Sequence, residues 1–220
     1  MSNNSGFFIT LEGIEGSGKS TQADYLFSFL KEVNIPCLLT REPGGTPLGD
    51  KIRDLLLNPK SGVIDPLAEV FLFEASRREH IKQVIGPALQ EGKIVICVRF
   101  TDSTLAYQGY GRRVPLSHLY YLNDITTEGI VPDLTVLLDV EPQVGLARSL
   151  SHTNEEELRF EKEFLRSKEF LWAVRDGYLQ LAQESPERFV VIDTTNRSKK
   201  EVSVMVQEIV WQRLRGRGVS

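Results

Sequence analysis

One glycine-rich segment constrains the fold of this 220-residue chain more than any other feature. Residues 13–20 read GIEGSGKS, after an apolar run at residues 7–11 and before a stretch with helical spacing of apolar side chains. The spacing matches the pattern G-x-x-x-x-G-K-[ST], whose backbone N–H groups and following helix N-terminus bind phosphate oxygens. The segment therefore predicts a nucleoside-triphosphate site between a β-strand and an α-helix.

The residue types of this segment suit that chemistry. Glycine reaches backbone conformations closed to other residues and lets the chain approach an anion closely. Lys19 is long enough to reach the β- and γ-phosphates, and the Ser20 hydroxyl is placed to ligate Mg²⁺. The alternative is a chance glycine-rich turn, which the strand before it and the helix after it disfavour. We expect the triphosphate to contact Gly13, Ile14, Glu15, Gly16, Ser17, Gly18, Lys19, Ser20 and Thr21.

Short apolar runs recur along the chain and alternate with amphipathic stretches. The runs lack in–out alternation, as expected for strands buried on both faces of a parallel sheet. They lie at residues 7–11, 37–40, 94–98, 135–140 and 189–192. Apolar spacing of three to four residues predicts helices over residues 20–33, about 66–90, 155–183 and 199–214. This order predicts an α/β fold with three layers, α/β/α, around a five-stranded parallel sheet, in a single domain over residues 1–220.

Composition narrows the function classes. The chain has 26 Lys plus Arg against 30 Asp plus Glu, a net charge of −4, which argues against a general nucleic-acid binder. Cys37 and Cys97 lie in apolar runs and are expected to be buried, inert thiols of a reducing compartment. The N-terminus has no signal-peptide pattern, and no apolar stretch approaches the ~20 residues that span a membrane. We expect a soluble, cytoplasmic protein.

A phosphate loop is shared by kinases, switch GTPases and motor ATPases, so it does not choose among them. The chain lacks the Asn-Lys-x-Asp guanine signature and an LSGGQ-type segment, which weakens the switch and transporter interpretations. A polar, acidic stretch at residues 149–157, SLSHTNEEE, has two interpretations. It is either a solvated helix start with Thr153 or Asn154 as N-cap, or a mobile lid.

Three further segments carry a resemblance to a known family. They read TREPGGTPLGDKIR at residues 40–53, LFEASRREH at 72–80 and VRFTDSTLAYQGYG at 98–111. With the phosphate loop, their order and spacing resemble bacterial thymidylate kinases, from about Phe8 to about Tyr178. The resemblance implies a P-loop kinase fold with a short lid over about 149–162, and transfer of phosphate from ATP to dTMP in dTTP synthesis. It also implies Mg²⁺ as cofactor and a homodimer.

The resemblance places the first acceptor residues. It implies that Glu42 and Arg53 face the phosphate side of dTMP, although a simple Pro-Gly turn and a surface arginine are the alternatives. Phe73 and Arg77 lie four residues apart on one helical face, where they would otherwise be a core phenylalanine and a snorkelling arginine. The resemblance implies that they stack on and hydrogen-bond thymine. Ser76 departs from the aspartate of the family pattern, so no orienting carboxylate for Arg77 is evident.

The segment after the third predicted strand supplies the rest of the acceptor site. A cation at the end of a strand facing a phosphate loop can neutralise charge on a transferring phosphoryl group, which suits Arg99; a structural ion pair is the alternative. Ser103 would line the nucleoside pocket. The resemblance implies that Thr104 and Gln108 lie near the base, and that Tyr107 packs against the sugar where a 2′-hydroxyl would clash.

The metal site departs from the family pattern. Val98 replaces an aspartate that normally precedes the arginine, so Ser20 is the expected Mg²⁺ ligand, with Glu15, Glu42 or Asp102 as candidates to replace the missing carboxylate. We hypothesise that activity survives with weakened metal affinity.

The phosphate loop also lacks the arginine that some relatives carry there. Arg159 is therefore the first candidate for a catalytic lid cation beside Lys19 and Arg99, and Arg148 is the second. Glu161 is expected to face the acceptor or pair with Arg159. Another nucleoside monophosphate kinase, a non-catalytic nucleotide-binding module and a GTPase switch remain the rival interpretations.

Overall fold

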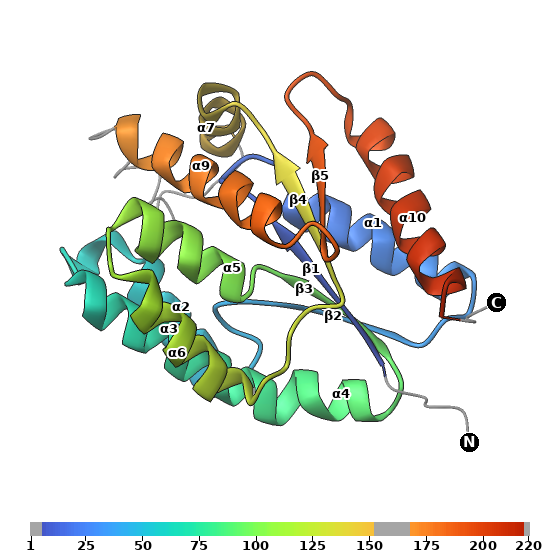
Figure 1. The fold of residues 1–220 in the computed structure, drawn as a ribbon, viewed down its shortest axis with the longest axis horizontal. Helices are drawn as coiled ribbons and strands as arrows, with labels where there is room; N and C mark the ends of the chain where they lie inside the picture. Colours follow the sequence, from blue (N-terminus) through green and yellow to red (C-terminus); the bar gives the residue numbers. More distant parts are fainter. Residues whose placement is uncertain (1–5, 152–167, 218–220) are drawn as a thin grey trace.

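A parallel sheet forms the middle layer of the molecule. The computed structural model of the chain describes residues 6–151 and 168–217. Five strands pair in the order β2-β3-β1-β4-β5, all parallel (Figure 1). They are β1 (Phe7–Glu12), β2 (Cys37–Arg41), β3 (Ile94–Val98), β4 (Leu134–Asp139) and β5 (Phe189–Asp193). The predicted α/β class and the five parallel strands are confirmed.

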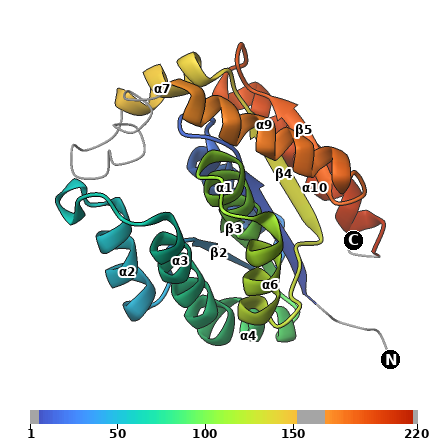
Figure 2. The same ribbon diagram turned by 60° about the vertical axis from the view of Figure 1, so that its left-hand side comes forward.

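Helices cover both faces of this sheet. On one face, α1 (Lys19–Glu32) packs beside α10 (Lys199–Arg215), which begins with a capping box of Ser198 and Glu201. Both helices follow the predicted apolar spacing. On the other face, α2 (Pro47–Leu57), α3 (Pro66–His80) and α6 (Leu116–Thr127) lie side by side (Figure 2). The remaining α-helices in the described part of the chain are α4 (Gly86–Gln90), α5 (Thr101–Thr104), α7 (Pro142–Leu150) and α9 (Lys168–Glu184), with a short 3-10 helix at Pro59–Ser61.

The predicted helix over about 66–90 exists as one continuous helical segment. It runs through α3, a π turn at Ile81–Ile85, and α4. The helix predicted over 155–183 begins in the described part of the chain at Lys168, and its first residues lie outside that part. Helices α2 and α6 were not predicted, because part of their apolar residues lie on the exposed face, Leu55 of α2 and Tyr121 of α6 among them, and blur the helical period. No helix in residues 6–151 and 168–217 is long and apolar enough to cross a membrane.

The two faces of β1 differ in chemistry. Phe7, Ile9 and Leu11 pack with the apolar side chains of α1 and α10. The other face carries Thr10 and Glu12, which are fully buried. The sheet therefore presents a buried polar stripe to the layer that contains α5 and α9, and this stripe fixes the segments that follow β3.

Strand β2 lies at the edge of the sheet, and its residues are half-buried or, at Arg41, exposed. Cys97 in β3 is buried as predicted, but the prediction that Cys37 is buried is wrong, because an edge strand has a neighbour on one side only. Both cysteines are free thiols.

The chain turns sharply after β3. Arg99 adopts a left-handed conformation with φ of 67°, and α5 then continues into a π turn, η3 (Leu105–Gly111). A Cβ on Gly111 would lie 2.6 Å from the ring of Phe170, so glycine allows η3 to pack closely against α9. π turns within helices are frequent at functional sites, so η3 is a candidate part of such a site. It brings Tyr107 and Gln108 to the carboxyl edge of the sheet.

Candidate active site

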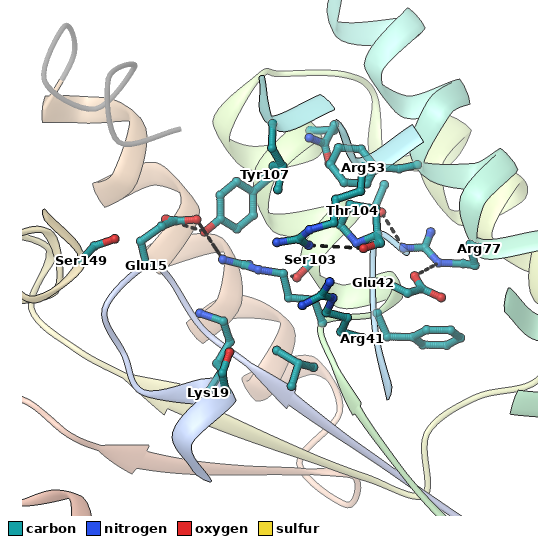
Figure 3. Close-up of a pocket in the computed structure, with 18 of the residues that line it drawn as sticks. Glu15, Lys19, Arg41, Glu42, Arg53, Arg77, Ser103, Thr104, Tyr107 and Ser149 are labelled. Atoms are coloured by element: carbon teal, nitrogen blue, oxygen red, sulfur yellow. Dashed lines mark hydrogen bonds and ion pairs between the residues drawn. The ribbon is translucent and has the colours of Figure 1, made fainter. Parts of the chain in front are cut away.

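A cavity of about 280 Å³ lies at the carboxyl ends of β1, β2 and β3, where ligands bind in open α/β folds. Figure 3 shows Glu15 and Lys19 facing Glu42, Arg53 and Arg77 across it. Every residue predicted for the acceptor lines the cavity: Glu42, Arg53, Phe73, Arg77, Arg99, Ser103, Thr104, Tyr107 and Gln108. From the phosphate loop, Glu15, Gly16, Lys19 and Ser20 also line it. Arg41 and Val98 line it as well, and sequence reasoning missed Pro43, Leu57, Phe100 and Ser149 as lining residues.

The phosphate loop is shaped by close backbone contacts. Gly13 and Gly16 have φ of 137° and 70°, in the left-handed region that favours glycine. A Cβ on Gly16 would lie 1.9 Å from the carbonyl oxygen of Gly145 in α7, so no larger residue fits. Lys19 donates from Nζ to the Ile14 carbonyl at 2.7 Å and lies within hydrogen-bond distance of Ser17 Oγ at 3.3 Å. The loop leads into the N-terminus of α1, whose N–H groups favour an anion.

Arg99, Glu15 and Tyr107 form a compact triad beside this loop. Arg99 Nη2 lies 2.8 Å from Glu15 Oε1 and 3.1 Å from the Tyr107 hydroxyl, which donates to Glu15 at 2.7 Å. Burial disfavours the charged guanidinium, but the oxygens of Tyr107 and Glu15 outweigh it and raise the pKa of Arg99 well above its usual value. Burial raises the pKa of Tyr107 well above 10, so its hydroxyl remains a donor at neutral pH.

Arg77 is the centre of a second cluster, deeper in the cavity. It is 1% exposed and donates to Glu42 Oε2 at 2.9 Å, Glu74 Oε1 at 2.5 Å, Asn123 Oδ1 at 2.7 Å and Thr104 Oγ1 at 3.0 Å. Burial opposes the charge, but Glu74 and Glu42 raise the pKa of Arg77 above its usual value.

This cluster contains the carboxylates that orient Arg77, which the serine at position 76 cannot supply. Two carboxylates, Glu42 and Glu74, orient Arg77 without an aspartate at position 76. The Ser76 hydroxyl instead accepts a hydrogen bond from the Gly44 N–H at 3.1 Å. The position of Glu74, three residues before Arg77 on α3, was the signal in the sequence that could have identified this partner.

Glu12 supports the start of α5 from beneath. One carboxylate oxygen accepts from the Phe100 N–H at 2.7 Å, and the other accepts from the hydroxyls of Ser103 at 2.6 Å and Tyr178 at 2.9 Å. Burial, and then the nearby Asp102, raise the pKa of Glu12 to about 7. Sequence reasoning missed Glu12; a carboxylate that ends an apolar strand was the available signal.

The candidate metal ligands differ in the hydrogen bonds and ion pairs that they already make. Glu42 accepts from Arg77 and makes a second contact with His80 Nδ1 at 3.1 Å, and Asp102, 1% exposed, is paired with Arg188 at 2.6 Å. Ser20 and Glu15 line the cavity beside the phosphate loop, and Glu15 is also paired with Arg99 at 2.8 Å and accepts from the Tyr107 hydroxyl. No cluster of three or more His, Cys, Asp or Glu side chains suited to a metal occurs among the described residues. This fits Mg²⁺, which binds nucleotides through phosphate oxygens and water with one or two protein ligands.

The predicted lid lies largely outside the described residues, and so do Arg159 and Glu161. Arg148 is described, at the end of α7. Its Nη2 donates to the carbonyl oxygens of Thr194 and Thr195 at 3.1 and 2.8 Å, which holds it against the loop after β5.

Comparison with known proteins identifies the family. The family model described as Thymidylate kinase matches residues 11–206. The chain belongs to the thymidylate kinase family. A thymidylate kinase of Geobacter sp. (strain M21) is 45% identical over 217 residues, covering 97% of this chain and 95% of that protein. One of Symbiobacterium thermophilum is 42% identical over 214 residues, covering 96% and 97%.

A solved structure supports the same family. The crystal structure of thymidylate kinase from Ehrlichia chaffeensis matches with a TM-score of 0.77 and 37% sequence identity, covering 94% of this chain and 99% of that chain. Thymidylate kinases are nucleoside monophosphate kinases that use ATP. The P-loop kinase fold expected from the sequence is therefore confirmed.

Proposed function

We propose that this protein transfers the γ-phosphoryl group of ATP to the 5′-phosphate of dTMP and forms dTDP, a step of dTTP synthesis. One observation carries the proposal: a phosphate loop and a nucleoside-sized pocket share one cavity at the edge of one sheet. This arrangement supports direct transfer between two bound nucleotides, with catalysis by positioning and charge neutralisation.

The base pocket has the chemistry to hold thymine. Phe73 lines the cavity one helical turn before Arg77 and offers a ring for stacking. A guanidinium has five N–H donors, and four of those of Arg77 have acceptors among the described residues. We assign the remaining Nη2 proton to a thymine carbonyl oxygen. Thr104, which accepts from the same Nη2, and Gln108 complete this end of the pocket.

The sugar pocket favours deoxyribose. Tyr107 packs edge-on against Phe170 and Tyr178, and Arg99 lies over its ring at 4.8 Å from the centroid. The ring is therefore held from several sides and does not move aside for an extra hydroxyl. We assign Tyr107 as the residue that excludes a 2′-hydroxyl.

The transfer itself uses cations from three directions. Lys19 lies on the donor side at the phosphate loop, and Arg99 lies between donor and acceptor with its charge maintained. Arg53 lines the acceptor side, where it also donates to the Pro43 carbonyl at 3.3 Å. We assign these three to the phosphates, with Arg159 as the predicted lid cation. In-line transfer needs neutralisation of the charge spread over the three equatorial oxygens of the transferring phosphoryl group, and these cations are assigned to supply it.

The proposed reaction uses Mg²⁺ as the cofactor that binds with ATP. We assign Ser20 as its protein ligand, with Glu15 as the carboxylate that the phosphate loop itself contributes to the cavity, and phosphate oxygens and water complete the set. When bound, the metal neutralises charge on the donor phosphates. With Val98 in place of an aspartate, we expect saturation only at higher Mg²⁺ concentration than a relative with that carboxylate.

The test is phosphoryl transfer by the purified protein with ATP and Mg²⁺. The proposal expects ADP and dTDP from dTMP, slower reaction of dUMP, and little reaction of UMP, CMP or AMP. Faster reaction of another monophosphate would favour a different nucleoside monophosphate kinase. ATP binding without transfer to any acceptor would favour a non-catalytic module, and preference for GTP would favour a switch.

We also propose that the protein is a homodimer of single-domain chains in the cytoplasm. Free cysteines are compatible with a reducing compartment. A set of large apolar side chains is exposed along the outer surface of α3 and α6: Leu67, Phe71, Tyr121 and Ile125. Arg78 of α3 pairs with Glu128 after α6 at 2.7 Å, so these surfaces adjoin. Apolar area of this kind on adjacent helices supports contact with a second copy.

A further inference from the structure

A buried carboxylate lies directly behind the base pocket. Glu69 of α3 has no exposed surface and does not line the cavity. Its Oε1 accepts from Gln108 Nε2 at 2.7 Å. Arg112 contacts both carboxylate oxygens, from Nε and Nη2, each at 3.1 Å. Glu69 is therefore held from two sides, with Gln108 between it and the cavity.

This contact fixes which end of the Gln108 amide faces the ligand. An ionised carboxylate accepts hydrogen bonds and cannot donate them, so the NH₂ group of Gln108 must face Glu69 and the carbonyl oxygen must face away. Gln108 is 1% exposed and lines the cavity. Its Oε1 accepts no hydrogen bond from the described residues. The pocket thus presents an acceptor at this position.

An acceptor at this position distinguishes pyrimidine bases. Thymine and uracil carry an N3–H donor, whereas N3 of cytosine is a lone pair and its C4 carries an amino group in place of a carbonyl. Beside a bound base, an acceptor such as Gln108 Oε1 would pair with N3–H of thymine and repel the N3 lone pair of cytosine. A flipped amide would present NH₂ and favour cytosine instead. Discrimination therefore depends on the group that prevents the flip.

We propose that Glu69 is a positioning residue that selects bases with an N3–H group, by locking the Gln108 amide with its oxygen toward the base. This rests on the proposed function, in which Gln108 lies beside the base. Arg112 holds Glu69 in place, and Arg77 provides separate discrimination through its donor to the carbonyl at C4. Loss of Glu69 therefore weakens selectivity without abolishing it.

The experiment compares wild type with Glu69→Gln, using kcat/KM for dTMP and for dCMP. The amide introduced by this substitution can donate or accept, so it pairs with either orientation of the Gln108 amide. We expect the dTMP:dCMP ratio of kcat/KM to fall by about tenfold or more, the size associated with a buried donor or acceptor left mismatched. Calorimetric binding of the two monophosphates without ATP should show the same change in ratio.

Two controls isolate the effect. Gln108→Leu lowers the ratio by itself, and adding Glu69→Gln to it should change the ratio no further, because the amide is gone. Asp139→Asn removes a carboxylate from another bidentate pair, with Arg175 at 2.7 Å, and should leave the ratio unchanged. An equal loss for dTMP and dCMP in Glu69→Gln, or a further fall in the Gln108→Leu background, would overturn the proposal.

The outcomes separate the two proposals. A wild-type protein that does not phosphorylate dTMP overturns the proposed function, whereas a dTMP kinase with an unchanged ratio in Glu69→Gln overturns only the role of Glu69. Should Glu69→Gln fail to fold, Glu69→Met with Arg112→Leu replaces both partners by apolar groups, which buried ion pairs often tolerate. The same fall in ratio is then expected, and an unchanged ratio overturns the proposal.

Discussion

At the scale of single residues, Glu12 is fully buried and its carboxylate accepts hydrogen bonds from three donors. Its position at the end of β1 places it under Phe100 and Ser103, so it holds the backbone that carries Arg99. The apolar character of β1 predicted the strand correctly. The partners of Glu12 could not be predicted, because Ser103 and Tyr178 are brought to it from distant parts of the chain by α5 and α9.

The raised pKa of Glu12 predicts a specific pH dependence of stability. The folded protein keeps the Glu12 proton until the pH approaches about 7, whereas the unfolded chain releases it near its ordinary value of 4.5. Between these values the folded state binds more protons, so this contribution to the free energy of unfolding falls as pH rises. We expect the difference between wild type and Glu12→Gln to decline by up to roughly 3 kcal/mol from pH 4 to pH 8.

Urea unfolding of both proteins at several pH values measures this difference. The Glu12→Gln variant is the internal control, because every other titrating group is retained. A difference that stays constant over the whole range would contradict the assignment of a raised pKa to Glu12.

At the scale of elements, α5 is a single helical turn that contributes to the cavity and is held by an ion pair. Asp102 of α5 contacts Arg188, just before β5, at 2.6 and 2.9 Å. Asp102 is 1% exposed, and Arg188 also donates to Thr135 Oγ1 in β4. This pair, with Asp102 buried and Arg188 half-buried, ties α5 to β4 and to the residue that precedes β5.

Removing Arg188 should therefore be costly. Arg188→Ala leaves Asp102 charged and buried without its partner, and we expect a loss of about 3–5 kcal/mol in the free energy of unfolding. Arg175→Ala is the matched control, because its partner Asp139 is 12% exposed and remains partly hydrated. Urea unfolding should show the smaller loss for Arg175→Ala. Equal losses would contradict a special role for the pair at α5.

The elements that were predicted and those that were missed differ in a physical way. The buried strands and α1 have enough apolar residues to set a clear period. Helix α6 has apolar side chains on its exposed face, Tyr121 and Ile125 among them, which blurs the periodicity. The π turn η3 has no sequence period of its own and depends on contact with α9. Local pattern therefore predicts the layers but not the segments that shape the cavity.

At the scale of the whole molecule, the outer surface of α3 and α6 is where we propose that a second copy binds. Phe71 of this surface is 54% exposed and follows the exposed Leu67 by one turn of α3. Phe71→Glu places a charge on this surface, and we expect it to shift the protein toward monomer in sedimentation velocity. The expected reason is the cost of burying an unpaired carboxylate in an apolar interface.

Val204→Glu is the control for that experiment. Val204 is 55% exposed on α10, on the opposite side of the sheet from α3 and α6 (Figure 1). It should sediment as the wild type does. A Phe71→Glu protein that sediments identically to wild type and Val204→Glu would exclude this surface from the interface.

The contact between Gly16 and Gly145 has a consequence for how portable this phosphate loop is. A Cβ on Gly16 would collide with the carbonyl of Gly145, and a Cβ on Gly145 would lie 2.6 Å from the Glu15 carbonyl. The backbone of the phosphate loop and the backbone of α7 therefore pack directly against each other, although they come from opposite halves of the chain. We therefore expect that residues 13–20, transplanted into a scaffold without α7, would not keep the backbone conformation that they have here.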